Sequence, residues 1–293
     1  MADYNIRLMT EIDLENIAGI DAVCFSRKRM RSMENLKCIY HNFPDGCFVA
    51  TEGDNIIGYV FSHVFGKTGF IGPLGVPEEY RGKKISQAYI KKSIEALQRH
   101  GCTAIGLETR PEWPNNIGLY YKMGFTPTFL TVTGTFSEEL TYSSSNILDG
   151  ANIEPDAIEL FDKQFEKHNI GYSFINDINF TLKHNPDKIL FYVKSKSIMG
   201  FLAFDTDIYP FVWGIIHPMN DTSIFTDLLF SLKEKIDAPD IKIRINARYT
   251  SLQDLIRNGY KVEDVSVRMM LNGHEGDFIK HNNNSLVIRS WIS

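Results

Sequence analysis

The feature of this sequence that most constrains its fold is a weak internal repeat. Four short segments of the first half have counterparts in the second half, in the same order and at nearly constant spacing. The pairs are 48–50 with 190–192, 58–60 with 200–202, 76–77 with 217–218, and 124–125 with 259–260. The first two pairs have the same offset along the chain, and the offsets of the other two are slightly smaller. Four ordered matches indicate a duplicated fold.

The length and the position of a polar segment agree with a duplication. The chain has 293 residues, which is enough for two domains of roughly 150 residues each. Residues 137–150 include the run Ser143-Ser144-Ser145-Asn146, which has the composition of a linker. We therefore expect domains at 1–136 and 151–293, joined by a linker at 137–150.

Composition excludes several classes of protein. A hydrophobic fraction of 43% is that of a globular protein and excludes disorder and collagen. The net charge of −5 gives no general attraction for nucleic acid or an anionic membrane. The four cysteines contain no C-x-x-C pair, so we expect neither a disulfide framework nor a metal site. With no secretory signal or spanning segment visible, we expect a cytoplasmic protein.

Hydrophobic periodicity and turn residues predict the elements of the first half. Helical spacing is clearest at 85–100, where Gly101 stands at the position of a C-terminal cap. Gly53, Asp54 and Asn55 favour a hairpin between two β-rich runs. The predicted order is strand 5–8, helices 10–23 and 30–40, strands 47–51, 56–64 and 69–76, helix 85–100, strand 104–109, a short helix before Gly124, and strand 125–136. This order predicts an α+β fold with a mixed, mostly antiparallel twisted sheet flanked by helices.

The most informative segment runs from Leu74 to Ser86, where a strand passes through a basic, glycine-containing turn into a helix. A helix N-terminus offers unpaired N–H groups and the positive end of its dipole, which together suit a pyrophosphate. Arg81, Lys83 and Lys84 add positive charge at the same place. The alternative is a solvated basic turn that caps an ordinary helix.

A second segment, 116–125, follows the predicted strand 104–109 and contains Leu119-Tyr120 and Gly124-Phe125. Together the two segments resemble the GNAT family of N-acetyltransferases, which has an R-x-x-G-x-G/A loop before a helix and a later L-Y-x-x-x-G-F segment. The resemblance covers about residues 5–136. It departs from the family at Lys84, which stands where the family has glycine, and at Ser86, where it has glycine or alanine. The Cβ of Lys84 could obstruct a close backbone approach, or its charge could compensate.

The resemblance implies an acetyl-CoA site and a fold of two tandem GNAT-like domains. The backbone of Leu74 and Val76, on either side of Gly75, would pair with the pantetheine arm like an added strand. The pyrophosphate would be held by the segment that contains Arg81, Gly82, Lys83, Lys84, Ile85 and Ser86. Asn116 would either contact the cofactor or cap its own helix.

The resemblance also implies catalytic roles. Tyr120 would be the general acid that protonates the departing CoA thiolate, and its alternative role is that of a packed aromatic residue. A protonated amine must lose a proton before it attacks, so a base or a water chain is needed. Glu108 is our first candidate, against the alternative of a carboxylate facing solvent, and Glu79 and His63 are weaker candidates.

The second half lacks the same signals. After Pro218 come Met219, Asn220, Asp221 and Thr222, with no glycine-rich basic turn, and Leu255 stands at the position equivalent to Tyr120. We therefore expect a degenerate copy that does not bind CoA. The last stretch, 274–293, is polar except for the apolar residues 286–288 and a few others. The sequence does not decide whether residues 286–288 form a strand.

These observations favour an acetyltransferase that moves an acetyl group from acetyl-CoA to the amine of a small molecule or peptide, by direct attack in a ternary complex and without a metal. Two alternatives remain open: transfer of a larger acyl group, and a non-catalytic CoA-sensing or partner-binding module. Acceptor specificity is expected in residues 27–42 and at the domain junction. The sequence leaves the choice between a monomer and a homodimer open.

Overall fold

The computed structural model describes residues 4–26, 30–136, 146–168, 172–205, 211–217, 223–236, 241–247, 251–272 and 285–288. These residues form two compact units. Unit 1 contains the residues up to Pro127 together with 269–272, and unit 2 contains 128–268 together with 285–288. No helix of the described residues is long and apolar enough to cross a membrane.

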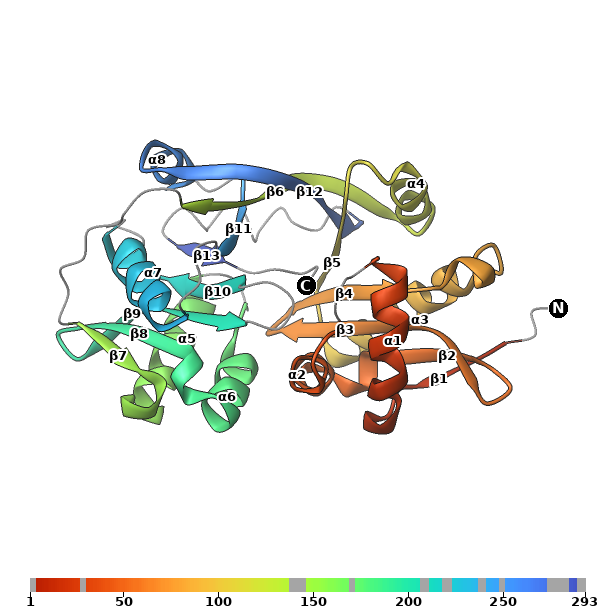
Figure 1. Ribbon diagram of the computed structural model, residues 1–293, viewed down its shortest axis with the longest axis horizontal. Coiled ribbons are helices and arrows are strands. Elements are labelled where there is room, and N and C mark those ends of the chain that lie inside the picture. The colour runs from red at the N-terminus through yellow and green to blue at the C-terminus, as the bar shows by residue number, and fades with distance from the viewer. Residues whose placement is uncertain are drawn as a thin grey trace. The chain divides into compact units, whose positions relative to one another are not determined.

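Unit 1 has the predicted order of elements (Figure 1). Its sheet has the strand order β1-β2-β3-β4-β5, in which only β4 and β5 are parallel. This confirms the predicted α+β class with a mostly antiparallel sheet. The elements are β1 (Asn5–Leu8), α1 (Leu14–Cys24), α2 (Met33–Asn42), β2 (Phe48–Glu52), β3 (Asn55–Phe65), β4 (Thr68–Gly75), α3 (Ile85–His100), β5 (Ala104–Thr109), α4 (Pro114–Lys122) and the first residues of β6 (Phe125–Phe136).

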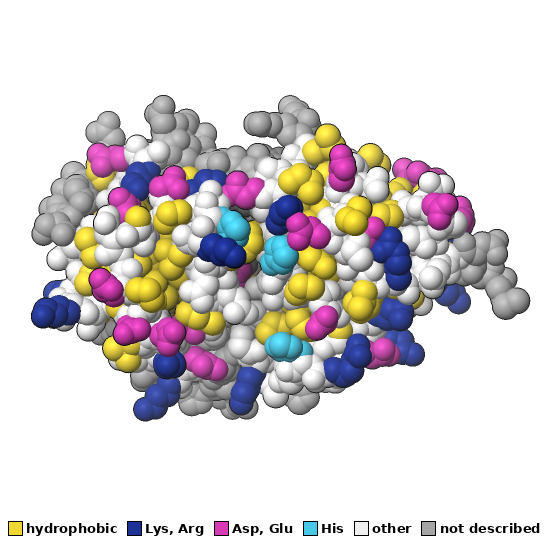
Figure 2. All heavy atoms as spheres, turned by 90° about the horizontal axis from the view of Figure 1, so that it is seen from below, with side chains coloured by type: hydrophobic (Ala, Val, Ile, Leu, Met, Phe, Trp, Pro, Cys, Tyr) yellow, Lys and Arg dark blue, Asp and Glu magenta, His cyan; other side chains and the backbone are white. Residues whose placement is uncertain are grey.

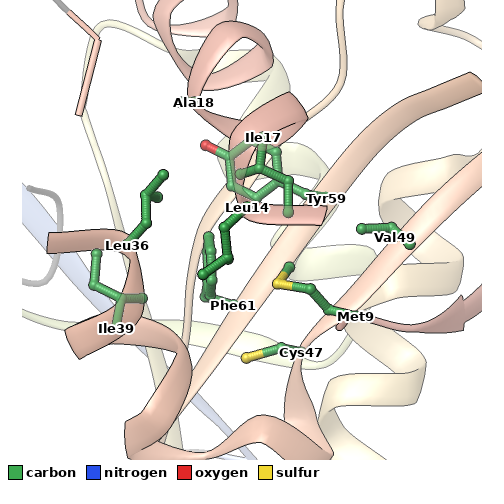
Figure 3. Packing of buried hydrophobic residues seen from close by; sticks show 10 residues of the cluster. All are labelled: Met9, Leu14, Ile17, Ala18, Leu36, Ile39, Cys47, Val49, Tyr59 and Phe61. Atoms are coloured by element: carbon green, nitrogen blue, oxygen red, sulfur yellow. The ribbon is translucent and has the colours of Figure 1, made fainter. Parts of the chain in front are cut away.

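Helices cover both faces of the unit 1 sheet. Leu14 and Ile17 of α1 and Leu36 of α2 pack against Tyr59 and Phe61 of β3, and all five side chains are buried (Figure 3). The intervening residues of β3 face α3, because successive side chains of a strand point to opposite faces. A Cβ built at Gly58 would accordingly lie 3.1 Å from the hydroxyl oxygen of Tyr89 on α3. The sheet is thus fixed between α1 and α2 on one face and α3 on the other.

Unit 2 repeats this order of elements. Its strand order is β12-β6-β11-β13-β10-β9-β8-β7, with β10 and β11 as the parallel pair. The elements are β7 (Ile147–Asp149), α5 (Pro155–His168), α6 (Ile175–His184), β8 (Ile189–Lys194), β9 (Ser197–Asp205), β10 (Phe211–Ile216), α7 (Ser223–Ile236), β11 (Lys242–Asn246), α8 (Ser251–Arg257), β12 (Tyr260–Leu271) and β13 (Leu286–Ile288).

The backbone confirms the predicted repeat of the fold in detail. The β2–β3 pair has an irregular register between Ala50 and Thr51, and the β8–β9 pair has one between Tyr192 and Val193. The two irregularities stand at equivalent positions, because Ala50 and Tyr192 are the last residues of the matching segments 48–50 and 190–192. A β-bulge kept at one position in both units indicates two copies of one local structure.

The division into units differs from the expected linker at 137–150. Residues 137–145 lie outside the described residues, and Ile147–Asp149 form β7. The reason for the difference is that each unit contains strand residues from the other half of the chain. Residues 131–134 of β6 pair with β11 inside unit 2. Conversely, the end of β12 lies beside β5 inside unit 1. A Cβ built at Gly106 of β5 would lie 2.5 Å from the sulfur of Met270 on β12.

Charged side chains of both signs are interspersed on the face of the molecule shown in Figure 2. Lys and Arg lie there among Asp and Glu, and hydrophobic side chains are scattered between them. The described residues therefore form no extended basic surface on that face.

Candidate functional site

Strands β4 and β5 separate after a short parallel contact. Residues Thr68, Gly69 and Phe70 pair with β5, and no described residue of β5 pairs with β4 beyond that point. On the other edge of β4, Val60 lies opposite Leu74 and Ser62 opposite Ile71, so β4 carries an extra residue in a bulge. The end of β4 therefore has one edge held by β3 and one edge open to an added strand.

The turn after β4 leads into α3 with two left-handed residues. Gly82 has φ of +85° and Lys84, the residue before α3, has φ of +65°. Lys84, which stands where the GNAT motif has glycine, thus has a backbone conformation that favours glycine. For a residue with a Cβ, this conformation costs roughly 1–2 kcal/mol of conformational free energy. The first N–H groups of α3, beginning with Ile85 and Ser86, have no preceding helical carbonyl to bind.

The three basic side chains of the turn are used differently. The Lys83 ammonium forms an ion pair with Glu52 at 3.0 Å and lies 5.1 Å from the centroid of the Tyr80 ring. The Nε of Arg81 donates to the Val76 carbonyl at 3.3 Å, and the Arg81 residue is exposed. Lys84 is exposed as well, so Arg81 and Lys84 are the cations best placed to meet an anion at the helix N-terminus.

Helix α4 carries Tyr120 and Asn116. The Tyr120 side chain is half-buried, its ring lies 6.4 Å from the ring of Phe125, and burial raises the pKa of its hydroxyl to about 12. The phenol is therefore protonated at neutral pH, as a general acid must be. Asn116 does not cap the helix, because α4 begins at Pro114 with Trp113 as its cap, and the Asn116 N–H donates to the Trp113 carbonyl at 3.0 Å.

Glu108 lies near the end of β5 and is buried, with 8% of its surface exposed, which contradicts the alternative of a carboxylate facing solvent. His63 is also buried, and its Nε2 lies 2.9 Å from the Gly72 carbonyl oxygen, as expected of a hydrogen-bonded strand residue. Glu79 is exposed in the turn before Arg81. The described residues contain no group of three His, Cys, Asp or Glu side chains that could hold a metal ion.

Sequence reasoning missed a buried charged network next to β4. The Tyr59 hydroxyl donates to Asp21 at 2.5 Å, and the Arg31 Nε donates to the same carboxylate at 3.1 Å. Both charged side chains are 1% exposed, and burial raises the pKa of Tyr59. Gly75 makes room for this arrangement, since a Cβ built there would lie 2.6 Å from the Tyr59 ring. The available signal was an aspartate four residues after Ile17 on an apolar helix face.

Unit 2 differs at the equivalent positions. Strand β10 pairs with β9 from 211 to 216 without a bulge, and β13 lies along its other edge. Leu255, the counterpart of Tyr120, is fully buried on α8. Residues 219–222, which lack a basic, glycine-rich motif in the sequence, lie outside the described residues.

With this geometry in place, the class of protein follows from comparison with known families. Residues 14–125 match the profile of the Acetyltransferase (GNAT) family. The matched region runs from α1 to the first residue of β6 and includes the open β4 edge, the basic turn and Tyr120. This N-terminal region, less than half of the chain, is thus similar to the GNAT acetyltransferase family.

Among curated proteins, the chain is similar to N-alpha-acetyltransferase 30 of Xenopus laevis, with 29% identity over 32% of this chain and 36% of that protein. The chain thus spans about a third of the length of that relative. It is also 27% identical to an acetyltransferase of Pectobacterium atrosepticum, over 41% of this chain and 86% of that protein.

Solved structures match both units. A candidate acetyltransferase from Pyrococcus horikoshii has a TM-score of 0.74 at 17% identity, over 97% of this chain and 94% of that one. A GCN5-related N-acetyltransferase from Sphaerobacter thermophilus has a TM-score of 0.64 at 12% identity, over 92% and 96% of the two chains. These likenesses show the fold, which consists of two GNAT-like halves.

Proposed function

We propose that this chain is an acetyl-CoA-dependent N-acetyltransferase with one acetyl-CoA site, in unit 1. The observation that carries the proposal is the open edge at the end of β4, followed within ten residues by the N-terminus of α3. An extended amide-containing arm and a pyrophosphate are the two parts of CoA that such an arrangement recognises. The match of residues 14–125 to the Acetyltransferase (GNAT) family supports the same assignment.

In this proposal, different segments of the site bind different parts of acetyl-CoA. The backbone of Leu74 and Val76 pairs with the pantetheine arm, and Gly75 between them keeps the Tyr59 ring close to β4. The N–H groups of the segment 82–86 hold the pyrophosphate together with the Arg81 guanidinium. The Lys84 amine adds a positive charge near the pyrophosphate. This attraction compensates for the closer backbone approach that a glycine at position 84 would allow.

The chemistry is the attack of an amine nitrogen on the acetyl carbonyl carbon. A carbon–nitrogen bond forms, the carbon–sulfur bond breaks, and the thiolate takes a proton from the Tyr120 hydroxyl. A backbone N–H in the segment 74–76 stabilises the oxyanion of the tetrahedral intermediate. The proton that the amine loses passes to Glu108 directly or through water, since this carboxylate lies on the neighbouring strand β5.

For the acceptor, we propose a peptide N-terminal amine as the first class to test. This choice is supported by the names of the relatives, several of which are N-alpha-acetyltransferases. A small-molecule amine is the alternative acceptor class. A second candidate function, CoA binding without turnover, is favoured by one observation, the lysine in place of the family glycine at position 84.

Titration calorimetry of acetyl-CoA into the full chain tests the binding step, and we expect one equivalent to bind. Arg81→Glu should weaken this binding by roughly 10-fold or more, because it places a carboxylate beside a pyrophosphate. Arg99→Glu is the matched control, since Arg99 lies exposed at the other end of α3 and the change in charge is the same. Equal effects of the two substitutions would place the pyrophosphate elsewhere.

Turnover is measured separately as thiol release, with peptide amines and small amines offered in parallel. Thiol release that depends on the acceptor would support the transferase. Binding of acetyl-CoA without thiol release from any acceptor would favour the non-catalytic alternative. Absence of binding at millimolar acetyl-CoA would contradict both.

A further inference from the structure

Strand β13 lies in a slot of unit 2 that has a counterpart in unit 1. Strands β10 and β11 pair in parallel at Phe211 and Val212 only, and then separate. In unit 1, β4 and β5 likewise pair over a few residues and then separate. In unit 2 the space after the separation holds β13, which pairs antiparallel with β10 and reaches β11 through Ile245 and Ile288.

The register places the ends of β4 and β10 at equivalent positions of the two units. Leu74 pairs with Val60 and Gly214 pairs with Leu202, and these two partners end the matching segments 58–60 and 200–202 of the repeat. By the same comparison Gly75, which pairs with Tyr59, corresponds to Ile215, which pairs with Phe201. The pairs of β13 are Gly214 with Ile288, Ile215 with Val287, and Ile216 with Leu286. Strand β13 thus lies along the counterpart of the β4 edge at Leu74 and Gly75, where the proposed function places the pantetheine arm.

The contacts of β13 are those of a bound apolar strand. Leu286 and Ile288 are fully buried, and Val287 between them is 8% exposed. The Oγ of Ser285, which precedes the strand, lies 2.8 Å from Nδ1 of His217, which follows β10. Main-chain pairing supplies affinity in such an arrangement, and the alternate side chains supply specificity.

We infer that unit 2 is a binding module for an extended apolar peptide and that the chain supplies this peptide itself, as the segment 285–288. The comparison with pantetheine rests on the proposed function of unit 1, whereas the peptide binding does not. The segment closes the slot of unit 2, so the chain keeps a single acetyl-CoA site.

The test uses a chain ending at Asn284 and a fluorescein-labelled synthetic peptide of residues 285–293. We expect the shortened chain to bind the peptide saturably at one equivalent in fluorescence anisotropy, and the full chain to leave it free because its slot is filled. A peptide with aspartate in place of Leu286 and Ile288 is the matched control, and it should not bind. A shortened chain that is folded by circular dichroism and binds no peptide would overturn the inference.

Hydrogen exchange on the full chain keeps the inference testable if the shortened chain does not fold. We expect the amides of 286–288 to be protected to the same degree as those of β10, because the two strands open together. Free exchange of 286–288 beside a protected β10 would overturn the inference, as would a second equivalent of acetyl-CoA bound by the full chain. Failure of acetyl-CoA to bind at all would instead contradict the proposed function and leave the peptide result standing.

Discussion

Strands β4 and β10 are equivalent in the repeat, but their edges differ. β4 carries a bulge and has one edge open beyond Phe70, whereas β10 is regular and has β13 on the corresponding edge. Apart from β13, the order of helices and strands along the chain is the same in both units. The difference shows that one fold can leave this strand edge open or fill it with a further strand.

A second difference concerns two buried aspartates, Asp21 on α1 and Asp162 on α5. They are equivalent in the repeat, because their separation along the sequence equals that between the matching segments 76–77 and 217–218. Asp21 is bound by the charged Arg31 and the Tyr59 hydroxyl. Asp162 accepts from the Ser173 hydroxyl at 2.5 Å and from the Phe174 N–H at 3.0 Å. In both units the aspartate ties its helix to the start of the next one, but only unit 1 uses a charged partner.

The largest expected effect concerns the tyrosine that unit 2 lacks. Tyr120→Phe keeps the packing against Phe125 but removes the hydroxyl, so the rate of transfer should fall by about 10²- to 10⁴-fold. The affinity for acetyl-CoA should change little. Tyr121→Phe is the matched control, because Tyr121 is the adjacent residue of α4 and is 51% exposed. Equal rates in the two variants would mean that Tyr120 only packs.

The next effect is on stability and separates the two buried aspartates. Arg31→Met leaves the Asp21 carboxylate buried without its cation and should lower the free energy of unfolding of unit 1 by about 3–5 kcal/mol. Ser173→Ala removes a neutral hydroxyl from Asp162 and should cost unit 2 only about 1 kcal/mol. Urea unfolding followed by hydrogen exchange in each unit measures both. Equal losses would show that the charge on Arg31 adds nothing.

A smaller effect distinguishes the units by pH. Hydrogen bonds from Arg7 lower the pKa of Asp13 to about 2, whereas burial raises the pKa of Asp162. Asp13 therefore stabilises unit 1 above its unfolded pKa near 3.8, by at most about 2 kcal/mol, and this contribution is lost as pH falls toward 2. Asp162 has the opposite sign: its contribution is present at low pH and is lost as pH rises through its raised pKa.

Carboxyl titration by NMR measures the two values directly, with Asp13→Asn and Asp162→Asn to assign the signals. A midpoint for Asp13 near 3.8 would contradict the role of Arg7. A midpoint for Asp162 below 3.8 would contradict the role of burial.

The smallest effect concerns two lysines with the same backbone conformation. Lys84 in unit 1 and Lys196 in unit 2 both have φ of +65°, a region that favours glycine. Replacing either with glycine should raise the free energy of unfolding by about 1 kcal/mol or less, since relief of the left-handed strain is partly offset by chain entropy. Only Lys84→Gly should also alter acetyl-CoA affinity. An equal change in affinity for both variants would remove Lys84 from the site.

Local signals explain which parts of the fold could be predicted. The limits 85–100, 104–109 and 125–136 agree with α3, β5 and β6, because glycine caps and apolar spacing define these elements within a few residues. The exchange of strand residues between the halves could not be predicted, because it depends on contacts between distant parts of the chain. Local composition indicates only a linker. For the same reason the sequence left residues 286–288 undecided, whereas the structure shows them as β13.

The candidate site was predictable in its motifs and less so in its surroundings. The turn 81–86 and Tyr120 stand in recognisable local sequences, and their roles stay predictions until binding and turnover are measured. The burial of Glu108 and the network around Asp21 depend on tertiary packing, which no local pattern reports. The capping role for Asn116 was wrong, because Pro114 begins the helix earlier.

The exchange of strand residues has a consequence for how the protein is made. Unit 1 is completed by residues 269–272, which include the Asn272 N–H that donates to the Gly124 carbonyl at 3.0 Å. At a synthesis rate of about 5–20 residues per second, a ribosome needs roughly 7–30 s to travel from residue 125 to residue 269. During that time the nascent first half exposes the outer edge of β5, a template for pairing with other chains. A chaperone that shields this edge during translation should therefore raise the yield of folded protein.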